Sequence, residues 1–301
     1  CIRDRDIYHA AIANSGRKYP AFNMDGSYGG DKDYSNIHAL IRDSGEFKEN
    51  RNVLEDIVAT PKLAPGNYRI SHFDSPEARG VDVAFLYRPD VFKLEGQYPV
   101  KTVIPSLPDF KTRDILTMWG TIEDEPFFFM VAHWPSRLGG KDVSEFKRIA
   151  VGRQMRSIAD SVLQANPATK IVMMGDFNDD PTDKSITEGL GAKLKMKDLS
   201  AGDLYAPYAD MLKAGYGTLA YGDAWNIFDN IVISENLAKG STGKLKIQKA
   251  PGSKFYGNIF KQHYMIQKEG QYKGYPPRTY VGNNFQGGFS DHFPVYIYIS
   301  K

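Results

Sequence analysis

The sequence contains little cysteine, no long apolar run and almost no excess of one charge. A single Cys among 301 residues excludes a framework of internal disulfides and argues against thiolate zinc sites. No run of about 18 apolar residues occurs, so no transmembrane helix is predicted, and no signal-peptide pattern is visible. The formal net charge of +2 does not indicate a nucleic-acid-binding protein, so any basic patch must be local. Candidates for such a patch on one helix, where a solvated face is the alternative, are Lys141, Lys147, Arg148, Arg153 and Arg156.

The remaining composition is that of a globular α/β protein. Hydrophobic residues make up 42% and charged residues 25%, as in ordinary globular domains, and a chain of 301 residues can bury one large core. The clearest helix is predicted over residues 144–164, because apolar residues recur at helical spacing until Asn166-Pro167. Further helices are predicted over 34–41 and 53–60, and strands over 67–71, 81–87, 101–103, 115–122, 127–132 and 170–174. Strands packed with helices outside imply a layered α/β sandwich.

The most informative stretch is 171–181, where a short apolar strand ends at a glycine and leads into an acidic loop. In an extended backbone Asp176 and Asn178 point the same way, while Phe177 points back into the core. Two hard oxygen ligands at the end of a rigid strand suit Mg²⁺, Mn²⁺ or Ca²⁺ and the oxygens of a phosphate. A polar strand-to-loop turn is the alternative interpretation, because Asp and Asn are favoured turn residues.

Three further motifs place polar residues at the ends of apolar runs. The run 127–132 ends in His133, Asp229-Asn230 leads into a buried strand, and Asp291-His292 precedes the β-prone run 295–299. An Asp beside a His can hold one imidazole tautomer and raise its basicity, so Asp291 is predicted to position His292. The alternatives are a turn histidine, a core histidine bonded to a backbone carbonyl, and a turn that only initiates a strand.

Taken together, these motifs resemble the endonuclease/exonuclease/phosphatase superfamily. That group includes pancreatic-type deoxyribonuclease, abasic-site endonucleases, inositol-polyphosphate 5-phosphatases and sphingomyelinases. The matching residues, in the family's order, are His133, Asp176, Asn178, Asp229, Asn230, Ser290, Asp291 and His292. Each motif alone is short, but four in order, each at a strand end, form a specific pattern over residues 50–301. The sequences of segments 79–84 and 133–137 are similar to those of a bacterial extracellular-nuclease-like branch of the superfamily.

The resemblance implies a fold, a reaction and roles for individual residues. The implied fold is a four-layer α/β sandwich with two mixed β-sheets flanked by helices, and the implied reaction is divalent-metal-dependent phosphodiester hydrolysis, first of all by a nuclease. The implied catalytic residues are His133, Asp176, Asn178, Asp229, Asp291 and His292. Substrate contacts are implied for Tyr87, Arg113, Arg137 and Asn230, although Tyr87 could be core and Arg137 a structural ion pair. The ion, Mg²⁺ or else Mn²⁺ or Ca²⁺, is assigned to Asp176, Asn178, Asp291 and Glu49.

The start of the chain departs from the family pattern. No apolar strand ending in Asn precedes the first helix-like stretch, and the family's metal-binding Glu would fall at Phe47, which is not a ligand. Glu49-Asn50 matches only the tail of that motif. Residues 1–52 are therefore interpreted as a divergent or incomplete part of the domain, and 53–301 as its main part. Three explanations are considered, in decreasing order of preference. The chain is an incomplete gene product, a lipoprotein acylated at Cys1, or a divergent member of the family with a degenerate metal site.

Several functional alternatives stay open from sequence alone. One is an inactive or phosphate-binding member of the same fold, and another is a phosphomonoesterase or lipid phosphodiesterase. A third is a carbohydrate-active enzyme that pairs Asp176 with Asp229 or Asp291, although Asn178 and two histidines are not needed for that chemistry. The expected partner is nucleic acid or another phosphodiester, and the expected state is a monomer. The similar branch suggests a secreted, periplasmic or lipid-anchored protein.

Overall fold

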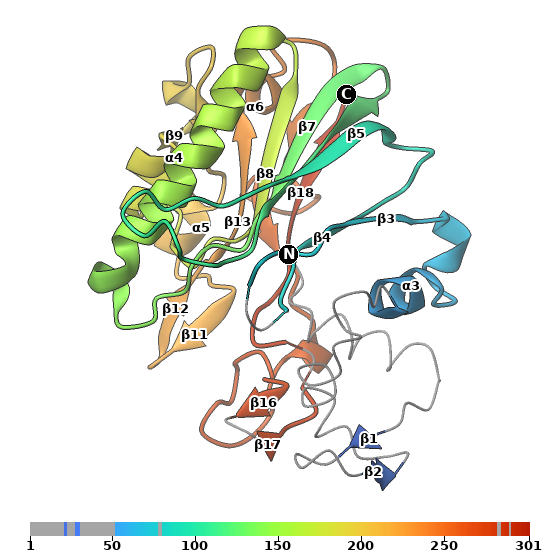
Figure 1. Ribbon diagram of the computed structural model, residues 1–301, viewed down its shortest axis with the longest axis vertical. Coiled ribbons are helices and arrows are strands. Elements are labelled where there is room, and N and C mark those ends of the chain that lie inside the picture. The colour runs from blue at the N-terminus through green and yellow to red at the C-terminus, as the bar shows by residue number, and fades with distance from the viewer. Residues whose placement is uncertain (1–20, 23–27, 31–51, 78–79, 282–283, 289) are drawn as a thin grey trace.

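The computed structural model describes residues 21–22, 28–30, 52–77, 80–281, 284–288 and 290–301. Its centre is a seven-stranded mixed sheet in the order β5-β6-β7-β8-β13-β10-β9 (Figure 1). The strands are β5 (Lys93–Val100), β6 (Ile115–Ile122), β7 (Glu125–Val131), β8 (Lys170–Asp176), β13 (Asp229–Ser234), β10 (Leu204–Tyr205) and β9 (Ala192–Lys193). Two of its pairings are parallel, β7 with β8 and β9 with β10, and the others are antiparallel. Helix α4 (Lys141–Ala165) makes the crossover between the parallel strands β7 and β8.

Three buried clusters show that the fold is layered. On one face of the large sheet, Met155 and Ala159 of α4 pack against strand residues such as Met173. On the other face, strand residues pack against a second layer of strands. Helix α3 (Asn52–Val58) then places Leu54 and Ile57 on that second layer. The layers therefore run helix, sheet, strands, helix, and the predicted α/β sandwich with flanking helices is confirmed.

The second layer is made of two antiparallel strand sets. Strand β3 (Arg69–His72) pairs with β4 (Ala84–Tyr87), and β18 (Val295–Ser300) lies between β14 (Lys246–Gln248) and β15 (Gly257–Ile259). Within the described ranges, no backbone ladder joins β4 to β18. The large sheet is thus mixed as predicted, whereas every ladder described in the second layer is antiparallel.

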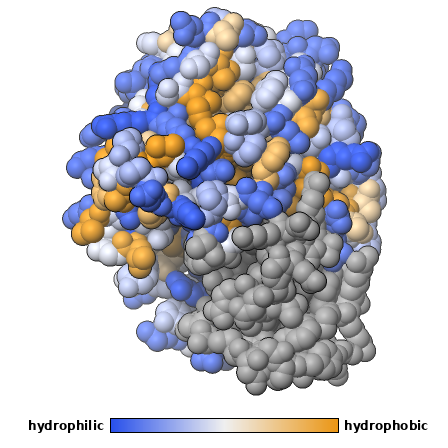
Figure 2. Space-filling view, viewed as in Figure 1, coloured by the Kyte–Doolittle hydropathy of each residue, from blue (hydrophilic) through white to orange (hydrophobic). Residues whose placement is uncertain are grey.

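Short elements fill the connections. They are β1 (Ala21–Phe22), β2 (Tyr28–Gly30), η2 (Ala64–Gly66), η3 (Ser185–Gly189), η4 (Met196–Asp198), α5 (Ala209–Lys213), β11 (Leu219–Tyr221), β12 (Ala224–Asn226), α6 (Glu235–Lys239), η5 (His263–Met265), β16 (Tyr280–Val281) and β17 (Asn284–Phe285). In the part of the chain that the structure describes, no helix is both long and apolar enough to cross a membrane. On the face drawn in Figure 2, apolar side chains form small groups among hydrophilic ones.

The sequence prediction was wrong at the β5 edge of the large sheet, and it did not include the two short strands β9 and β10. Residues 101–103, predicted as a strand, form none, and β5 just before them was not predicted. Strand β5 is an edge strand with a register shift between Leu94 and Gly96, and it carries charged residues and Pro99. Charge, proline and bulges are typical of edge strands, and they hide the alternation that marks a strand in sequence. The predicted helix over 34–41 lies outside the described residues.

Candidate active site

Two aspartates and two histidines meet at the edge of the large sheet where β7 and β8 end and β13 begins. Asp176 and Asp229 lie directly opposite each other in the antiparallel β8–β13 ladder. His133 Nε2 lies 3.4 Å from Asp176 Oδ2, and His292 Nδ1 lies 2.7 Å from Asp229 Oδ2. All four residues are more than nine-tenths buried. The structure therefore brings together four residues that come from widely separated parts of the sequence.

The backbone around Asp176 fixes the direction of its carboxylate. Gly175 has φ +142°, and a Cβ there would lie 1.8 Å from the carbonyl oxygen of Ala132, so only glycine fits between the two strands. The backbone N–H of Asn178 donates to Asp176 Oδ1 at 2.9 Å, which closes an Asx turn. The other carboxylate oxygen, Oδ2, is the one that lies near His133.

Asn178 does not continue the strand as the sequence suggested. Strand β8 ends at Asp176, and Asn178 has φ +53°, a left-handed conformation that Asn tolerates better than most residues. Its Nδ2 donates to the carbonyl oxygen of Trp134 at 2.9 Å. Phe177 points into the core as predicted, where it stacks on Trp134 with ring centroids 4.3 Å apart. These contacts join the loop after β8 to the loop after β7 and so hold Asp176 beside His133.

His292 is held by a different carboxylate from the one predicted. The sequence pointed to the neighbouring Asp291, but the short contact to Nδ1 is made by Asp229, 63 residues earlier in the chain. Asp291 is half-buried in the turn before β18, and its catalytic and metal-binding roles stay predictions. The backbone N–H of His292 donates to Ser290 Oγ at 3.0 Å, which shapes that turn. A carboxylate on Nδ1 favours the tautomer with its proton there and leaves Nε2 as the second functional atom of the ring.

A buried charge network lies directly behind these residues. Asp179 is fully buried, accepts a hydrogen bond from Ser185 Oγ at 2.6 Å, and pairs with Arg148 Nε at 2.7 Å. Arg148 is also fully buried and comes from α4, so this ion pair ties the loop after β8 to the helix. Because both charges are out of water, each depends on the other for compensation.

Arg137 completes this network. Its guanidinium lies 3.0 Å from Asp179 and 2.8 Å from Asp183, and its Nε donates to the carbonyl oxygen of Asn178 at 2.8 Å. The same group lies over the ring of Phe228, 4.2 Å from the centroid. The geometry therefore favours the structural ion pair over the predicted phosphate contact, because most of its donors already have partners.

Two other predicted substrate contacts lie in packed surroundings. Asn230 is fully buried, and its Nδ2 donates to the carbonyl oxygens of Asp179, Ile227 and Phe228. This arrangement holds the loops after β8 and before β13 together, and the substrate contact of Asn230 stays a prediction. The ring of Tyr87 lies 5.7 Å from that of Phe92 and packs against the core between the strand layers.

Two predicted site residues remain, Arg113 and Glu49, and only Arg113 lies among the described residues. Arg113 is buried just before β6, and β6 begins beside the end of β7, so Arg113 lies on the edge that carries His133. Glu49 falls outside the described residues. Most of the basic side chains considered for a patch on α4 are engaged locally. Arg148 is buried, Lys141 pairs with Asp183, and Arg156 pairs with Asp160.

Sequence reasoning missed a second group of potential metal ligands. His72 Nε2 lies 3.5 Å from Asp82 Oδ2, and Asp74 brings a third ligand atom within 4.8 Å of both. Burial raises the pKa of nearby Asp114, and the charge of Asp82 raises it further. His72 stood in no recognisable motif, so only the pairing of β3 with β4 could reveal this group.

Comparison with known proteins identifies the family. The family model described as the endonuclease/exonuclease/phosphatase family matches residues 40–301, and no curated protein gives a significant match. The chain belongs to this family. The resemblance drawn from the four motifs is confirmed, whereas the bacterial branch stays an expectation.

Solved structures show the same fold at low sequence identity. Humanized D. rerio TDP2 aligns with a TM-score of 0.50 and 14% identity over 83% of this chain and 81% of that one. D. rerio TDP2 complexed with a single strand DNA product gives a TM-score of 0.50 and 14% identity, over 83% and 82% of the two chains. The mannosyl-6-phosphatase Bt3783 of Bacteroides thetaiotaomicron reaches 0.48 at 15% identity, over 89% and 90%.

The residues at the sheet edge fit the divalent ion that enzymes of this family generally use. Asp176, Asp229 and His292 offer ligand atoms that all lie within 4.8 Å of one another. Two carboxylates facing each other on neighbouring strands repel, and burial strengthens that repulsion. A divalent cation would offset it, and carboxylate oxygens with an amide or imidazole nearby are donors that Mg²⁺ and Mn²⁺ accept.

One acid in the loop after β8 makes stability depend on pH. Burial and, to a smaller extent, repulsion from Asp183 raise the pKa of Asp180 from 3.8 to about 6, although the hydrogen bond from the N–H of Ile227 acts in the opposite direction. A folded-state pKa above the unfolded value favours the protonated form in the folded state. The contribution to stability is therefore full below about pH 4 and is lost as pH rises through about 6.

Asp180→Asn is expected to remove this loss. Asn is uncharged and keeps an acceptor for the N–H of Ile227, so the free energy of unfolding should rise at pH 8 by about 1–3 kcal/mol. At pH 3 the variant should nearly match the parent, because Asp180 is then mostly protonated in both the folded and the unfolded state. Urea unfolding at the two pH values measures this, with the exposed Asp109→Asn as the matched control. An equal gain at both pH values would contradict the assignment.

Proposed function

We propose that this protein hydrolyses phosphodiester bonds with a divalent metal ion, and that its substrate is nucleic acid. The observation that carries the proposal is the buried Asp229–His292 pair, whose contact is 2.7 Å, opposite the His133–Asp176 pair. A carboxylate-held imidazole is a general acid or base. A second carboxylate beside it supplies the negative oxygen donors that metal-assisted phosphoryl chemistry needs.

The proposed division of labour follows from which atoms are already engaged. Because Nδ1 of His292 is engaged by Asp229, this pair is assigned to proton transfer. The doubly protonated ring, stabilised by the carboxylate, would give its Nε2 proton to the leaving oxygen and return to the neutral form with its proton on Nδ1. Asp176, whose Oδ1 is fixed by the Asx turn, would hold the ion and orient the attacking water, with Asn178 beside it. His133, next to Asp176 Oδ2, would steady that carboxylate. A bound Mg²⁺ or Mn²⁺ would neutralise charge that grows on the phosphate oxygens.

The geometry argues against the carbohydrate-active alternative. The ligand oxygens of Asp176 and Asp229 approach within 4.8 Å. Retaining glycosidases separate their two carboxyl groups by about 5–5.5 Å, and inverting ones by more, so that a sugar or water fits between them. Here His292 contacts one of the two carboxylates directly, which leaves it committed to the imidazole.

A substrate panel tests the proposed function. Purified protein is expected to cleave single-stranded DNA or RNA, and bis(p-nitrophenyl) phosphate more slowly, while p-nitrophenyl phosphate is turned over least. Asp176→Asn should lose all of these activities, and the exposed control Asp109→Asn none. Preference for the monoester would assign the site to a phosphomonoesterase. Cleavage of a phospholipid diester but not of nucleic acid would assign it to lipid chemistry, and binding without turnover to an inactive member.

A further inference from the structure

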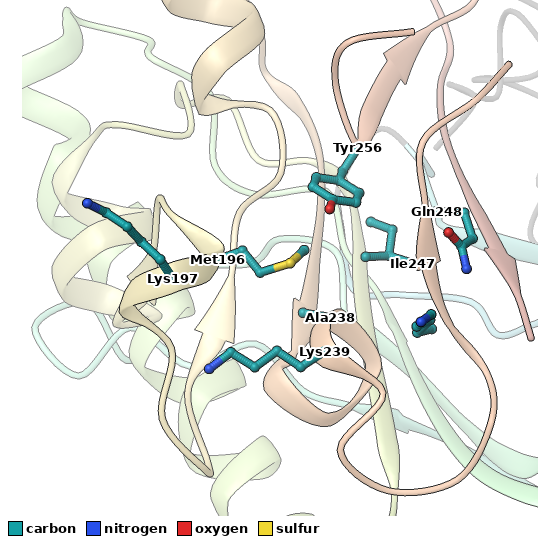
Figure 3. Close-up of a pocket in the computed structure, with 8 residues that line it drawn as sticks. Met196, Lys197, Ala238, Lys239, Ile247, Gln248 and Tyr256 are labelled. Atoms are coloured by element: carbon teal, nitrogen blue, oxygen red, sulfur yellow. The ribbon is translucent and has the colours of Figure 1, made fainter. Parts of the chain in front are cut away.

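A basic groove lies at the opposite end of strand β13 from the candidate active site. It has a volume of 490 Å³ and is walled by η4 on one side and by α6 and β14 on the other (Figure 3). Strand β13 begins at Asp229 and ends at Ser234, where α6 follows at once, so the α6 wall of the groove lies roughly 17 Å along the strand from Asp229. It is therefore separate from the residues assigned to catalysis.

The groove combines an apolar floor with a basic rim. Met196, Ile247 and Tyr256 line the floor, and Figure 3 shows their side chains pointing toward one another. The rim carries Lys197, Lys239 and Lys246. Tyr256 keeps part of its ring exposed, and the Nζ of Lys249 lies 5.2 Å from the centre of that ring.

Positive charge is concentrated on the two segments that wall the groove. Residues 192–198 carry three lysines and one acid, Asp198, and residues 239–254 carry five lysines and no acid, although the whole chain has a net charge of only +2. Among the residues that the structure describes, none of these eight lysines forms an ion pair. Lys239 Nζ donates to the carbonyl oxygen of Leu199 at 2.7 Å, but no acid in the described part of the chain neutralises the positive charge of this group.

This chemistry matches a strand of nucleotides. Flat aromatic and apolar side chains stack with bases regardless of sequence, and lysines at the rim neutralise phosphates, which is how proteins bind single strands. We propose that the basic groove is a second binding site for single-stranded nucleic acid, with a base against Tyr256 and Met196 and phosphates at Lys197 and Lys246. The proposal rests on the proposed function, because the strand held here would be the substrate that the distant site cleaves.

The test measures binding separately from cleavage. Fluorescence anisotropy with a labelled twelve-nucleotide oligo-dT in EDTA compares the wild type with Lys197→Ala/Lys246→Ala. The double variant is expected to bind at least about tenfold more weakly. The slope of log K against log salt should fall in magnitude by about 1.4, from two fewer phosphate contacts. The charge-matched control, Lys62→Ala/Lys213→Ala, changes two exposed lysines outside the groove and should leave affinity nearly unchanged.

Activity assays separate this proposal from the proposed function. Turnover of bis(p-nitrophenyl) phosphate by the groove variant should equal that of the wild type, while KM for the oligonucleotide rises and kcat stays the same. Hydrolysis of the small diester without any oligonucleotide binding would overturn the proposed binding role of the groove, but it would agree with the proposed catalytic function. Equal weakening by both double variants, or groove-dependent binding of anionic lipid vesicles but not of the oligonucleotide, would also overturn it. A third result would instead contradict the proposed function and support the groove. In that case oligonucleotide binding is lost only in the groove variant, and the wild type turns over no phosphoester.

Discussion

Replacing His292 by Ala is expected to lower kcat for phosphodiester cleavage by at least about 100-fold, the usual contribution of a positioned acid or base. The imidazole is buried and held by Asp229 at 2.7 Å, so the substitution removes the group to which proton transfer is assigned.

The pair should behave as one unit. Asp229→Asn is expected to lower kcat by a similar order, and the double variant should be little worse than His292→Ala alone, because residues that act together are not additive. His263→Ala is the matched control, since His263 is exposed and lies beside Tyr264 away from any acid described above. Near-parent kcat for His292→Ala, measured on protein shown to be folded by circular dichroism, would remove the pair from the mechanism.

Arg148→Met is expected to give the largest loss of stability, about 3–5 kcal/mol in the free energy of unfolding. Arg148 and Asp179 are both fully buried and lie 2.7 Å apart, so removal of the arginine leaves a buried carboxylate with less compensation. Arg137, at 3.0 Å from Asp179, offsets part of the loss. Met keeps a similar length of apolar chain, so the change reports the lost charge rather than a cavity.

The matched control for this prediction is on the same helix. Arg153→Met changes an exposed arginine of α4 and should cost less than about 0.5 kcal/mol. Adding Asp179→Asn to Arg148→Met should recover part of the lost stability, because it removes the uncompensated charge. A loss below about 1 kcal/mol for Arg148→Met in urea unfolding would show that the buried pair contributes little.

The sequence was most informative where a residue's role depends on its immediate neighbours. Strand β6 and helix α4 were predicted nearly to their ends, because β6 is a short β-prone run of mostly buried residues and α4 repeats apolar residues at helical spacing. Phe177 was placed in the core by simple alternation beyond Asp176. The ends of the apolar runs at 127–132 and 170–174 marked His133 and Asp176, because strand ends at one sheet edge bring side chains together.

What the sequence could not supply was partners that lie far apart in the chain. The carboxylate on His292 Nδ1 comes from Asp229, and the adjacent Asp291 was a plausible substitute until the strand register was known. Arg148 looked like any basic residue of an amphipathic helix, and only the packing of α4 on the loop after β8 reveals its buried pair with Asp179. Likewise, the left-handed turn at Asn178 depends on a carbonyl oxygen contributed by another loop.

We propose that the sheet edge where β7 and β8 end and β13 begins holds a divalent ion beside a carboxylate-held imidazole. The most direct measurement is an anomalous difference map from crystals of the protein soaked in Mn²⁺. One strong peak is expected within coordination distance of Asp176, next to the Asp229–His292 pair, and no such peak is expected in crystals of Asp176→Asn. A map with no peak at this edge at saturating Mn²⁺, or with a peak only at His72, Asp74 and Asp82, would contradict it.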